Sequence, residues 1–191
     1  ERPDDANKGT LGSLLCVCGS YGMAGAAVMS AKGALRTGIG LAKCALPRSI
    51  YPIVAQTILE SVYYPLSENA DGRISKVNVP FLVSESCKSS ATLVGCGLGV
   101  CDDTLKIVFS LIENSTTPLV LDADALNCVA KQPEILLRKK APIIITPHPG
   151  EMSRLTGLAT PLVNAERERV ALNFAQKYGV VTVLKGAGTV I

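Results

Sequence analysis

The stretch LLCVCGSYGMAGAAVMSAKGALRT, residues 14–37, decides the fold class of this chain. It opens with Leu14–Cys18, a run that is apolar at every position, which predicts a strand buried on both faces of a sheet. A turn of small residues follows, and Met23–Thr37 then repeats apolar residues such as Ala27 and Ala31 on one face of a predicted helix. A buried strand, a glycine-rich turn and a helix are the repeating parts of a parallel α/β sheet.

The same alternation of apolar runs and helical periodicity continues along the chain. The predicted strands are Leu14–Cys18, Leu41–Leu46, Thr92–Gly95, Leu119–Leu121, Ile143–Ile145 and Val180–Leu184. The predicted helices are Met23–Thr37, Asp102–Glu113 and Ala165–Tyr178. Tyr63–Ser90 is less regular, with a turn predicted at Asn69–Gly72 and an edge strand or loop at Lys76–Val83. We therefore expect a three-layer α/β/α fold with a mostly parallel central sheet, in a single domain over residues 1–191.

Composition narrows the function classes. The 191 residues are 48% hydrophobic and 18% charged with a net charge of +3, which suits a globular domain with one core. No apolar run approaches the roughly 20 residues that span a bilayer, and the first five residues lack the pattern of a signal peptide. We expect a cytoplasmic protein without membrane contact. The one basic cluster, Arg138–Lys140, is expected to cap a helix end, so we expect no nucleic-acid partner.

The cysteines and the single histidine argue against a zinc site. Seven cysteines occur without a CxxC spacing, and Cys16, Cys18, Cys44 and Cys96 lie in or beside apolar segments, where reduced thiols act as small hydrophobes. With His148 as the only imidazole, a zinc site is not expected.

Ligands of an open parallel sheet bind beyond the carboxyl ends of its strands, so the residues after each apolar run are the informative ones. Gly19–Ala26 has the spacing GxxGxxG and not the Rossmann GxGxxG; its glycines either admit a ligand to a helix N-terminus or serve tight packing alone. Gly95–Gly99 alternates three glycines before Asp102, a predicted helix cap.

Polar side chains follow the next two strands. Asp122 would project at the ligand edge and orient substrate or a magnesium shell, whereas Asp124 is expected to cap the next helix; a capping role alone is the alternative for both. His148 lies between Pro147 and Pro149, which hold it at that edge with little freedom. It is either structural or a group for substrate hydrogen bonding or proton transfer.

Two common catalytic arrangements do not fit. No GxSxG elbow supports a Ser–His–Asp hydrolase. Gly186 follows Lys185, which reverses the GK[ST] order of a Walker P-loop.

Six segments in order resemble one known family. They are NKGTLG at 7–12, GSYGMAGAA at 19–27, GCGLG at 95–99, LDADALN at 121–127, TPHPGEMSRLTG at 146–157 and VLKGAGTVI at 183–191. They are similar to the ADP/ATP-dependent NAD(P)H-hydrate dehydratases, the YjeF carboxy-terminal domain type, whose fold is ribokinase-like. The resemblance covers essentially the whole chain.

The resemblance implies a lyase that repairs a nicotinamide cofactor. Hydrated NADH or NADPH would return to the working cofactor while ADP is split to AMP and phosphate, or ATP to ADP and phosphate. Transfer of a phosphoryl group onto the ring hydroxyl converts a poor leaving group into phosphate. The implied partners are therefore hydrated NADH or NADPH and a nucleotide co-substrate, with Mg²⁺ as cofactor.

The resemblance also assigns residues by position. The hydrated dinucleotide is held by Ala26, Gly97 and His148. The nucleotide-binding turn is formed by Lys185, Gly186, Ala187, Gly188 and Thr189. Asp122 and Glu151 are expected in a supporting role, in part through magnesium.

The sequence departs from the family pattern at both ends. Asn7 and Leu11 replace a histidine and a tyrosine of the usual HKGTYG, which puts a polar role of these positions in doubt. The glycine-rich segment with the catalytic aspartate is expected beyond Ile191, so we expect the chain to be truncated and inactive alone. A homo-oligomer and a fused or partner epimerase domain are further expectations from the family. The alternatives are a ribokinase-like kinase of a small alcohol or vitamin precursor, and a non-catalytic nucleotide-binding fragment.

Overall fold

The computed structural model describes residues 9–191, which form a seven-stranded parallel sheet between helices. Asn7 and the first five residues lie outside this range. The strand order is β3-β2-β1-β4-β5-β6-β7, and every neighbouring pair is parallel. The strands are β1 (Ser13–Val17), β2 (Leu41–Pro47), β3 (Val62–Leu66), β4 (Ala91–Val94), β5 (Leu119–Leu121), β6 (Ile143–Ile145) and β7 (Val181–Thr182).

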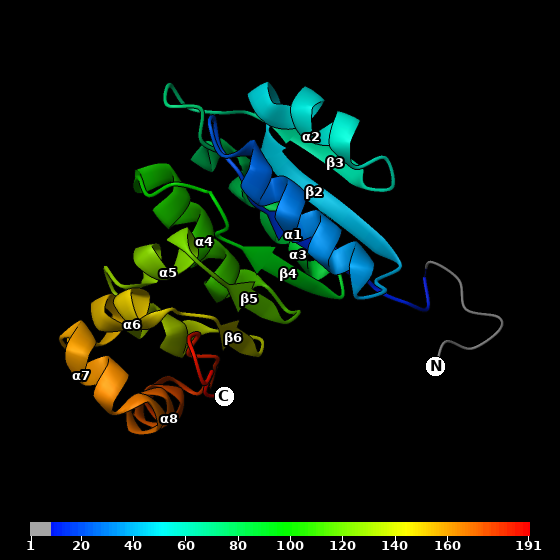
Figure 1. Ribbon diagram of the computed structural model, residues 1–191. Coiled ribbons are helices and arrows are strands. Elements are labelled where there is room, and N and C mark those ends of the chain that lie inside the picture. Colours follow the sequence, from blue (N-terminus) through cyan, green and yellow to red (C-terminus); the bar gives the residue numbers. More distant parts are fainter. Residues whose placement is uncertain (1–8) are drawn as a thin grey trace.

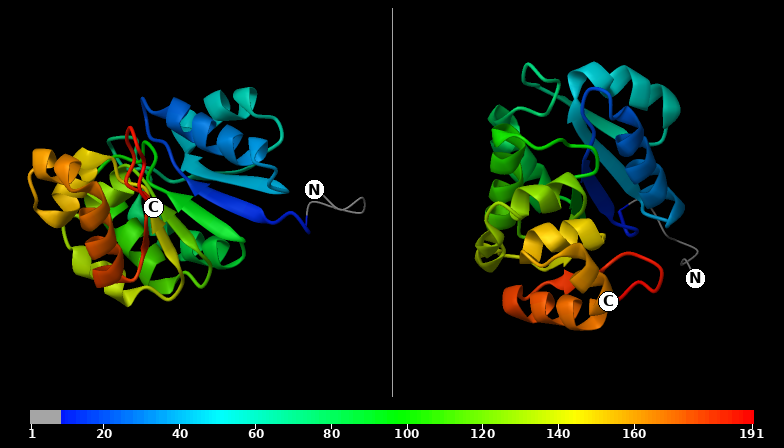
Figure 2. Two further views of the ribbon diagram at one scale, coloured as in Figure 1. Left: turned by 60° about the horizontal axis from the view of Figure 1, so that its bottom comes forward. Right: turned by 60° about the vertical axis from the view of Figure 1, so that its left-hand side comes forward.

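Helices connect consecutive strands and cover the sheet. The α-helices are α1 (Ala24–Arg36), α2 (Tyr51–Thr57), α3 (Val79–Cys87), α4 (Asp102–Asn114), α5 (Asp124–Val129), α6 (Pro149–Thr156), α7 (Thr160–Ala165) and α8 (Arg167–Tyr178). Short 3-10 turns are η1 (Arg48–Ile50), η2 (Lys76–Asn78) and η3 (Pro133–Arg138). Figure 1 shows the sheet with α1 and α2 in front of β1–β3, and Figure 2 shows α4 and α5 on the opposite side.

Strand β1 belongs to two hydrophobic cores at once. Its alternate residues Leu15 and Val17 lie in the core under α4, α5 and α8, whereas Cys16 lies in the core under α1 and α2. Successive side chains of a strand point to opposite faces, so a run without polar residues fits a strand that is covered on both sides. This confirms the prediction made from LLCVC.

The α1 face of the sheet is less covered beyond β1. Leu93, Val120 and Ile144 are aligned in register across β4, β5 and β6, and each is only half-buried. Val181 continues this row on β7 and is 48% exposed. An apolar groove therefore runs beside α1 along this face.

The structure confirms the six predicted strands and three predicted helices, with small shifts at their ends. The prediction for Lys76–Val83 is wrong, because this segment forms η2 and the start of α3. Pro80 lies in the first turn of α3, where a residue without an N–H is tolerated and its fixed φ favours a helix. The two edge strands of the sheet are instead β3, which contains Pro65, and β7.

Two capping predictions also need correction. The N-cap of α4 is Cys101 and not Asp102, and the N-cap of α5 is Ala123 and not Asp124. Both aspartates are the first residues of their helices, where a carboxylate still faces the positive end of the helix. The expectation for the basic cluster is confirmed at Lys139, whose Nζ donates to the carbonyl of Tyr178 at the end of α8 (2.7 Å).

All seven cysteines are free thiols. Cys16, Cys18 and Cys44 are buried, and burial raises the pKa of the Cys16 thiol, so these side chains pack as neutral apolar groups. Within residues 9–191 no helix is long and apolar enough to cross a membrane.

Truncation of a buried leucine should lower the free energy of unfolding much more than truncation of an exposed leucine. Leu111 of α4 is fully buried, whereas Leu172 of α8 is 57% exposed. We expect Leu111→Ala to lower the free energy of unfolding by about 2–5 kcal/mol, and Leu172→Ala to change it by less than about 0.5 kcal/mol. Urea denaturation followed by circular dichroism measures both values, and equal effects would contradict the assignment of the core.

Candidate active site

Five strand ends meet at one edge of the sheet. Strands β1, β4, β5, β6 and β7 are consecutive neighbours and run parallel, so the loops after their carboxyl ends lie side by side. From β1 the chain proceeds to β2 and β3 on one side and then crosses to β4 on the other. Such a switch point opens a crevice in which ligands of open α/β sheets bind.

The crevice between β1 and β4 brings Ala26 and Gly97 together. A Cβ on Gly97 would lie 2.6 Å from the Cβ of Ala26, so the loop after β4 packs directly on the first turn of α1. The Ser20 hydroxyl donates to the Gly97 carbonyl (2.8 Å) and fixes the loop in that position. Gly97 thus has a packing role, and the substrate contact predicted for Ala26 and Gly97 stays a prediction.

Asp122 is the centre of the polar groups at this edge. Its Oδ1 accepts hydrogen bonds from Lys185 Nζ (2.6 Å) and from the Thr146 hydroxyl (2.8 Å). Its Oδ2 lies 3.5 Å from the Cys96 thiol, which donates to it. One carboxylate therefore joins the loops after β4, β5, β6 and β7. The sequence identified Asp122 and Lys185 but missed Thr146, although Thr146 is the first polar residue after β6.

The surroundings of Asp122 hold it ionised. Burial alone would raise the pKa of its carboxyl, but the hydrogen bonds from Lys185 and Thr146 and the lysine charge outweigh burial and lower it. A carboxylate with a lowered pKa that already accepts three hydrogen bonds is a poor general base at neutral pH. Asp122 is better suited to anchor Lys185.

The backbone around Asp122 is tightly packed and strained. A Cβ on Gly95 would lie 1.9 Å from the Asp122 carbonyl oxygen, so only glycine allows the two loops to approach this closely. Ala123 has φ +51°, and it is the only non-glycine residue with positive φ in the described part of the chain. Such strain costs about 1–3 kcal/mol and tends to occur at ligand sites.

The segment Lys185–Thr189 forms a turn with unpaired donors. The strand pair that carries it is closed by reciprocal backbone hydrogen bonds between Leu184 and Val190 (2.9 and 3.2 Å), and the Lys185 N–H donates to Pro147 O (2.8 Å). The next four N–H groups have no acceptor within residues 9–191; they belong to Gly186, Ala187, Gly188 and Thr189. Consecutive free N–H groups in a glycine-containing turn make a site for an anion.

His148 is the N-cap of α6. Its Nδ1 accepts from the Gly150 N–H (3.0 Å), and its own N–H donates to Glu151 Oε2 (2.8 Å), which completes a capping box. Its Nε2 lies 3.4 Å from Glu151 Oε1, while the imidazole is 52% exposed. The structural reading of His148 is thus confirmed. The imidazole ring is exposed, and the neighbouring Pro147 carbonyl accepts the Lys185 N–H of the turn. The ring can therefore also contact a ligand, and this contact stays a prediction.

A groove of about 610 Å³ links several of these groups. It lies between α1 and the Lys185 turn and is mostly apolar. Its lining residues include Ala26, Leu93, Cys96, Val120, Asp122, Thr146 and Lys185. Ala26, Asp122 and Lys185 therefore open on one cavity, whereas Gly97 and His148 do not line it.

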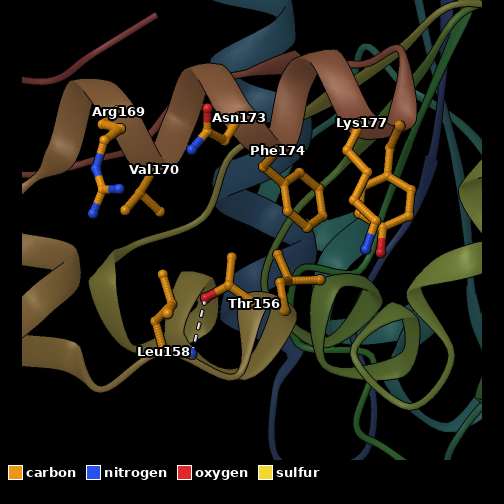
Figure 3. A pocket seen from close by; sticks show the side chains of 9 residues that line it. Thr156, Leu158, Arg169, Val170, Asn173, Phe174 and Lys177 are labelled. Atoms are coloured by element: carbon orange, nitrogen blue, oxygen red, sulfur yellow. Dashed lines mark hydrogen bonds between the residues drawn. The ribbon is translucent and has the colours of Figure 1, made fainter.

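A second pocket lies away from this edge (Figure 3). It measures about 320 Å³ and lies between α8 and the chain at the end of α6, with Phe174 and Val170 turned into it and Thr156 bonded to the Leu158 N–H. It contains none of the residues predicted for the site. Its apolar floor continues the core, and we do not assign it to the reaction.

The carboxylates of the edge do not form a metal cage. Among residues 9–191 no group of three or more histidine, cysteine or acidic side chains is arranged to hold a metal ion. Asp122 is paired with Lys185, Asp124 accepts from the Gly99 N–H (2.8 Å), and Glu151 belongs to the α6 cap. These side chains offer a cation few free ligand oxygens.

Removal of the Asp122 charge should destabilise the protein in a pH-dependent way. We expect Asp122→Asn to lower the free energy of unfolding by about 1–3 kcal/mol at neutral pH. Because the folded-state pKa of Asp122 is lowered, its contribution is present above the unfolded pKa of about 4 and is lost as pH falls through the folded pKa. The difference between wild type and Asp122→Asn should therefore shrink below about pH 4.

Urea denaturation between pH 7 and pH 3 measures this difference. Asp71→Asn is the matched control, because Asp71 is 67% exposed and its ion pair with Arg73 lies at the surface. A pH-independent difference for Asp122→Asn would contradict the ionised anchor.

Comparison with known proteins identifies the family of this chain. A family model described as NAD(P)H-hydrate dehydratase matches residues 14–191. The Bifunctional NAD(P)H-hydrate repair enzyme Nnr of Thermofilum pendens is 39% identical over 190 residues, which is 100% of this chain and 36% of that protein. The chain thus spans about a third of the length of this relative.

Solved structures give the same picture. The crystal structure of the ADP/ATP-dependent NAD(P)H-hydrate dehydratase from Bacillus subtilis, co-crystallised with ATP/Mg²⁺, is 29% identical with a TM-score of 0.79, covering 99% of this chain and 63% of that one. A ribokinase-like protein from Enterococcus faecalis, 20% identical with a TM-score of 0.80, covers 99% of this chain and 62% of its own and supports the fold alone. With the fold, the site and a family match over residues 14–191, the chain belongs to the NAD(P)H-hydrate dehydratase family.

Proposed function

We propose that this chain is the part of an ADP/ATP-dependent NAD(P)H-hydrate dehydratase that binds the nucleotide and the hydrated cofactor. The observation that carries the proposal is the turn Lys185–Thr189, in which four N–H groups without an acceptor in residues 9–191 lie beside a lysine held by Asp122. Backbone donors and one fixed ammonium group suit the phosphates of a nucleotide. The family supplies the matching reaction.

The proposed reaction has two steps that the turn would serve. A phosphoryl group moves from ADP or ATP to the hydroxyl of the hydrated ring, which forms one P–O bond and breaks another to release AMP or ADP. The C–O bond of the ring then breaks, phosphate leaves and the ring loses a proton. Positioning and charge stabilisation account for most catalysis in phosphoryl transfer, so fixed donors at the phosphates are the expected protein contribution.

The hydrated dinucleotide would lie along the groove beside α1. Ala26 lines this groove together with Asp122 and Lys185, so a ligand there would reach both the α1 turn and the nucleotide turn. Gly97 packs on Ala26 at the same end, and the His148 imidazole is exposed beyond Pro147. We propose all three as substrate contacts, with Asp122 and Glu151 as supporting residues.

Magnesium fits this proposal as a companion of the nucleotide. The B. subtilis relative was co-crystallised with ATP/Mg²⁺. Because the described carboxylates are already hydrogen-bonded, the phosphates would supply most of its ligands, and its bound role would be to neutralise their charge. A cytoplasmic location, a homo-oligomer, a fused or partner epimerase domain and a catalytic aspartate outside residues 9–191 stay predictions.

The decisive activity test uses the full-length polypeptide that contains this segment. We expect hydrated NADH or NADPH to regain the absorbance of the reduced nicotinamide only when ADP or ATP is present, with AMP or ADP and phosphate as co-products. A stable phosphorylated small alcohol and no regenerated cofactor would instead establish a kinase. Nucleotide binding without either product would leave a non-catalytic binding protein.

Two substitutions at His148 separate capping from substrate contact. His148→Ala removes both the imidazole and the cap, whereas His148→Asn keeps a side-chain acceptor that caps helices well. We expect both variants to bind the hydrated cofactor about tenfold more weakly, the loss that accompanies one hydrogen bond. Only His148→Ala should also lose stability, by about 1 kcal/mol.

Isothermal titration with hydrated NADH and urea denaturation give these two values. Unchanged affinity in His148→Asn would remove His148 from the substrate site and leave it a helix cap.

A further inference from the structure

Arg167 contacts the nucleotide turn from behind. It is the first residue of α8, and its guanidinium Nη2 donates to the carbonyl oxygens of Leu184 (2.8 Å) and Lys185 (3.0 Å). The side chain is half-buried. Its Nε is buried and has no acceptor among the residues that the structure describes. A buried donor without an acceptor contributes no stabilisation and costs free energy. The two carbonyl contacts of Nη2 are therefore the interactions that fix this side chain.

The two carbonyl contacts set the orientation of two peptide planes. In a trans peptide the N–H points opposite to the C=O of the same plane. The plane between Leu184 and Lys185 shows this directly, because its C=O faces Arg167 and its N–H donates to Pro147. In the next plane the Lys185 carbonyl also faces Arg167, so the Gly186 N–H points away from the guanidinium. None of the residues that the structure describes accepts a hydrogen bond from this N–H.

Gly186 permits this close packing. Its φ is +153°, and a Cβ at this position would lie 2.9–3.2 Å from the guanidinium atoms of Arg167. The planar guanidinium and the bare glycine backbone therefore contact each other directly. Both carbonyl bonds come from the single nitrogen Nη2 of this guanidinium.

We propose that Arg167 is a positioning residue that orients the Gly186 N–H, the first of the turn's four donors without an acceptor in residues 9–191, toward the nucleotide phosphates. The inference rests on the proposed nucleotide role of the turn. Arg167 acts through the backbone in this proposal, because the two N–H groups of its Nη2 are already bonded to the carbonyls of Leu184 and Lys185. Without it, the Leu184 carbonyl keeps only the bond from Val190. The Lys185 carbonyl loses its bond from Arg167, so the plane between Lys185 and Gly186 is free to rotate.

The test replaces Arg167 in the full-length polypeptide and uses Arg169 as the matched control. Arg169 lies two residues along the same helix, is 63% exposed and pairs with Glu166 instead of the turn. In Arg167→Met we expect faster amide hydrogen exchange at Lys185 and Val190, whose N–H groups are bonded in the wild type. We also expect ADP or ATP to bind about tenfold more weakly, as after loss of one charged hydrogen bond. The KM for the hydrated cofactor should change little, and Arg169→Met should match the wild type in all three values.

Other outcomes are equally informative. Unchanged amide hydrogen exchange in Arg167→Met overturns the proposal, whether or not the affinity for nucleotide falls. An equal loss of affinity for nucleotide and for the hydrated cofactor also overturns it. If the wild type binds no nucleotide while exchange still rises, the proposed function fails and the contact with the turn stands. If Arg167→Met does not fold, Arg167→Lys provides the test. We then expect a smaller rise in amide hydrogen exchange at Lys185 and Val190, and the absence of any rise overturns the proposal.

Discussion

The ion pair between Asp122 and Lys185 joins two loops whose residues are 63 positions apart in the chain. It is short and partly shielded, and Thr146 of the intervening loop binds the same carboxylate oxygen. Because β5, β6 and β7 are consecutive neighbours, these three residues can meet only if the strands end at the same level. The charge arrangement of the candidate site therefore depends on the register of the parallel sheet, and the ion pair holds an ammonium group at the base of the Lys185–Thr189 turn.

Small residues allow the other loops to close around this ion pair. Gly95 lets the loop after β4 approach the Asp122 carbonyl, and Gly97 lets the same loop pack on Ala26 at the start of α1. Ala123, directly after Asp122, adopts a positive φ, which is a strained conformation for a residue other than glycine. At Gly95 and Gly97 a packing role does not exclude ligand binding. Backbone without a side chain admits a neighbouring loop, and it also leaves N–H groups close to the surface of the crevice.

The site uses backbone donors more than side-chain charges for its predicted anionic ligand. Four consecutive N–H groups of the turn are free within residues 9–191, and only Lys185 adds a positive side chain from the turn itself. Backbone donors have no rotamers to order, but their direction must be fixed by neighbours. Pro147, the Leu184–Val190 bonds and Arg167 together provide this on three sides of the turn. His148, with its capping box, similarly fixes the start of α6 next to the turn.

The sequence by itself determined the parallel α/β fold, because apolar runs and helical periodicity are local properties that survive in any context. It also indicated Asp122, His148 and Lys185, since polar residues directly after buried strands must lie at the ligand edge. It did not reveal α3, because Val77 and Val79 alternate with polar residues like a strand, although the helix already begins at Val79. Only the tertiary structure decided that Thr146 and Lys185 share one carboxylate, that Cys101 and not Asp102 caps α4, and that Arg167 bonds the carbonyls of Leu184 and Lys185. These three features depend on contacts between residues that folding brings together or on the geometry of a helix cap. Neither can be read from the pattern of residue types along the chain.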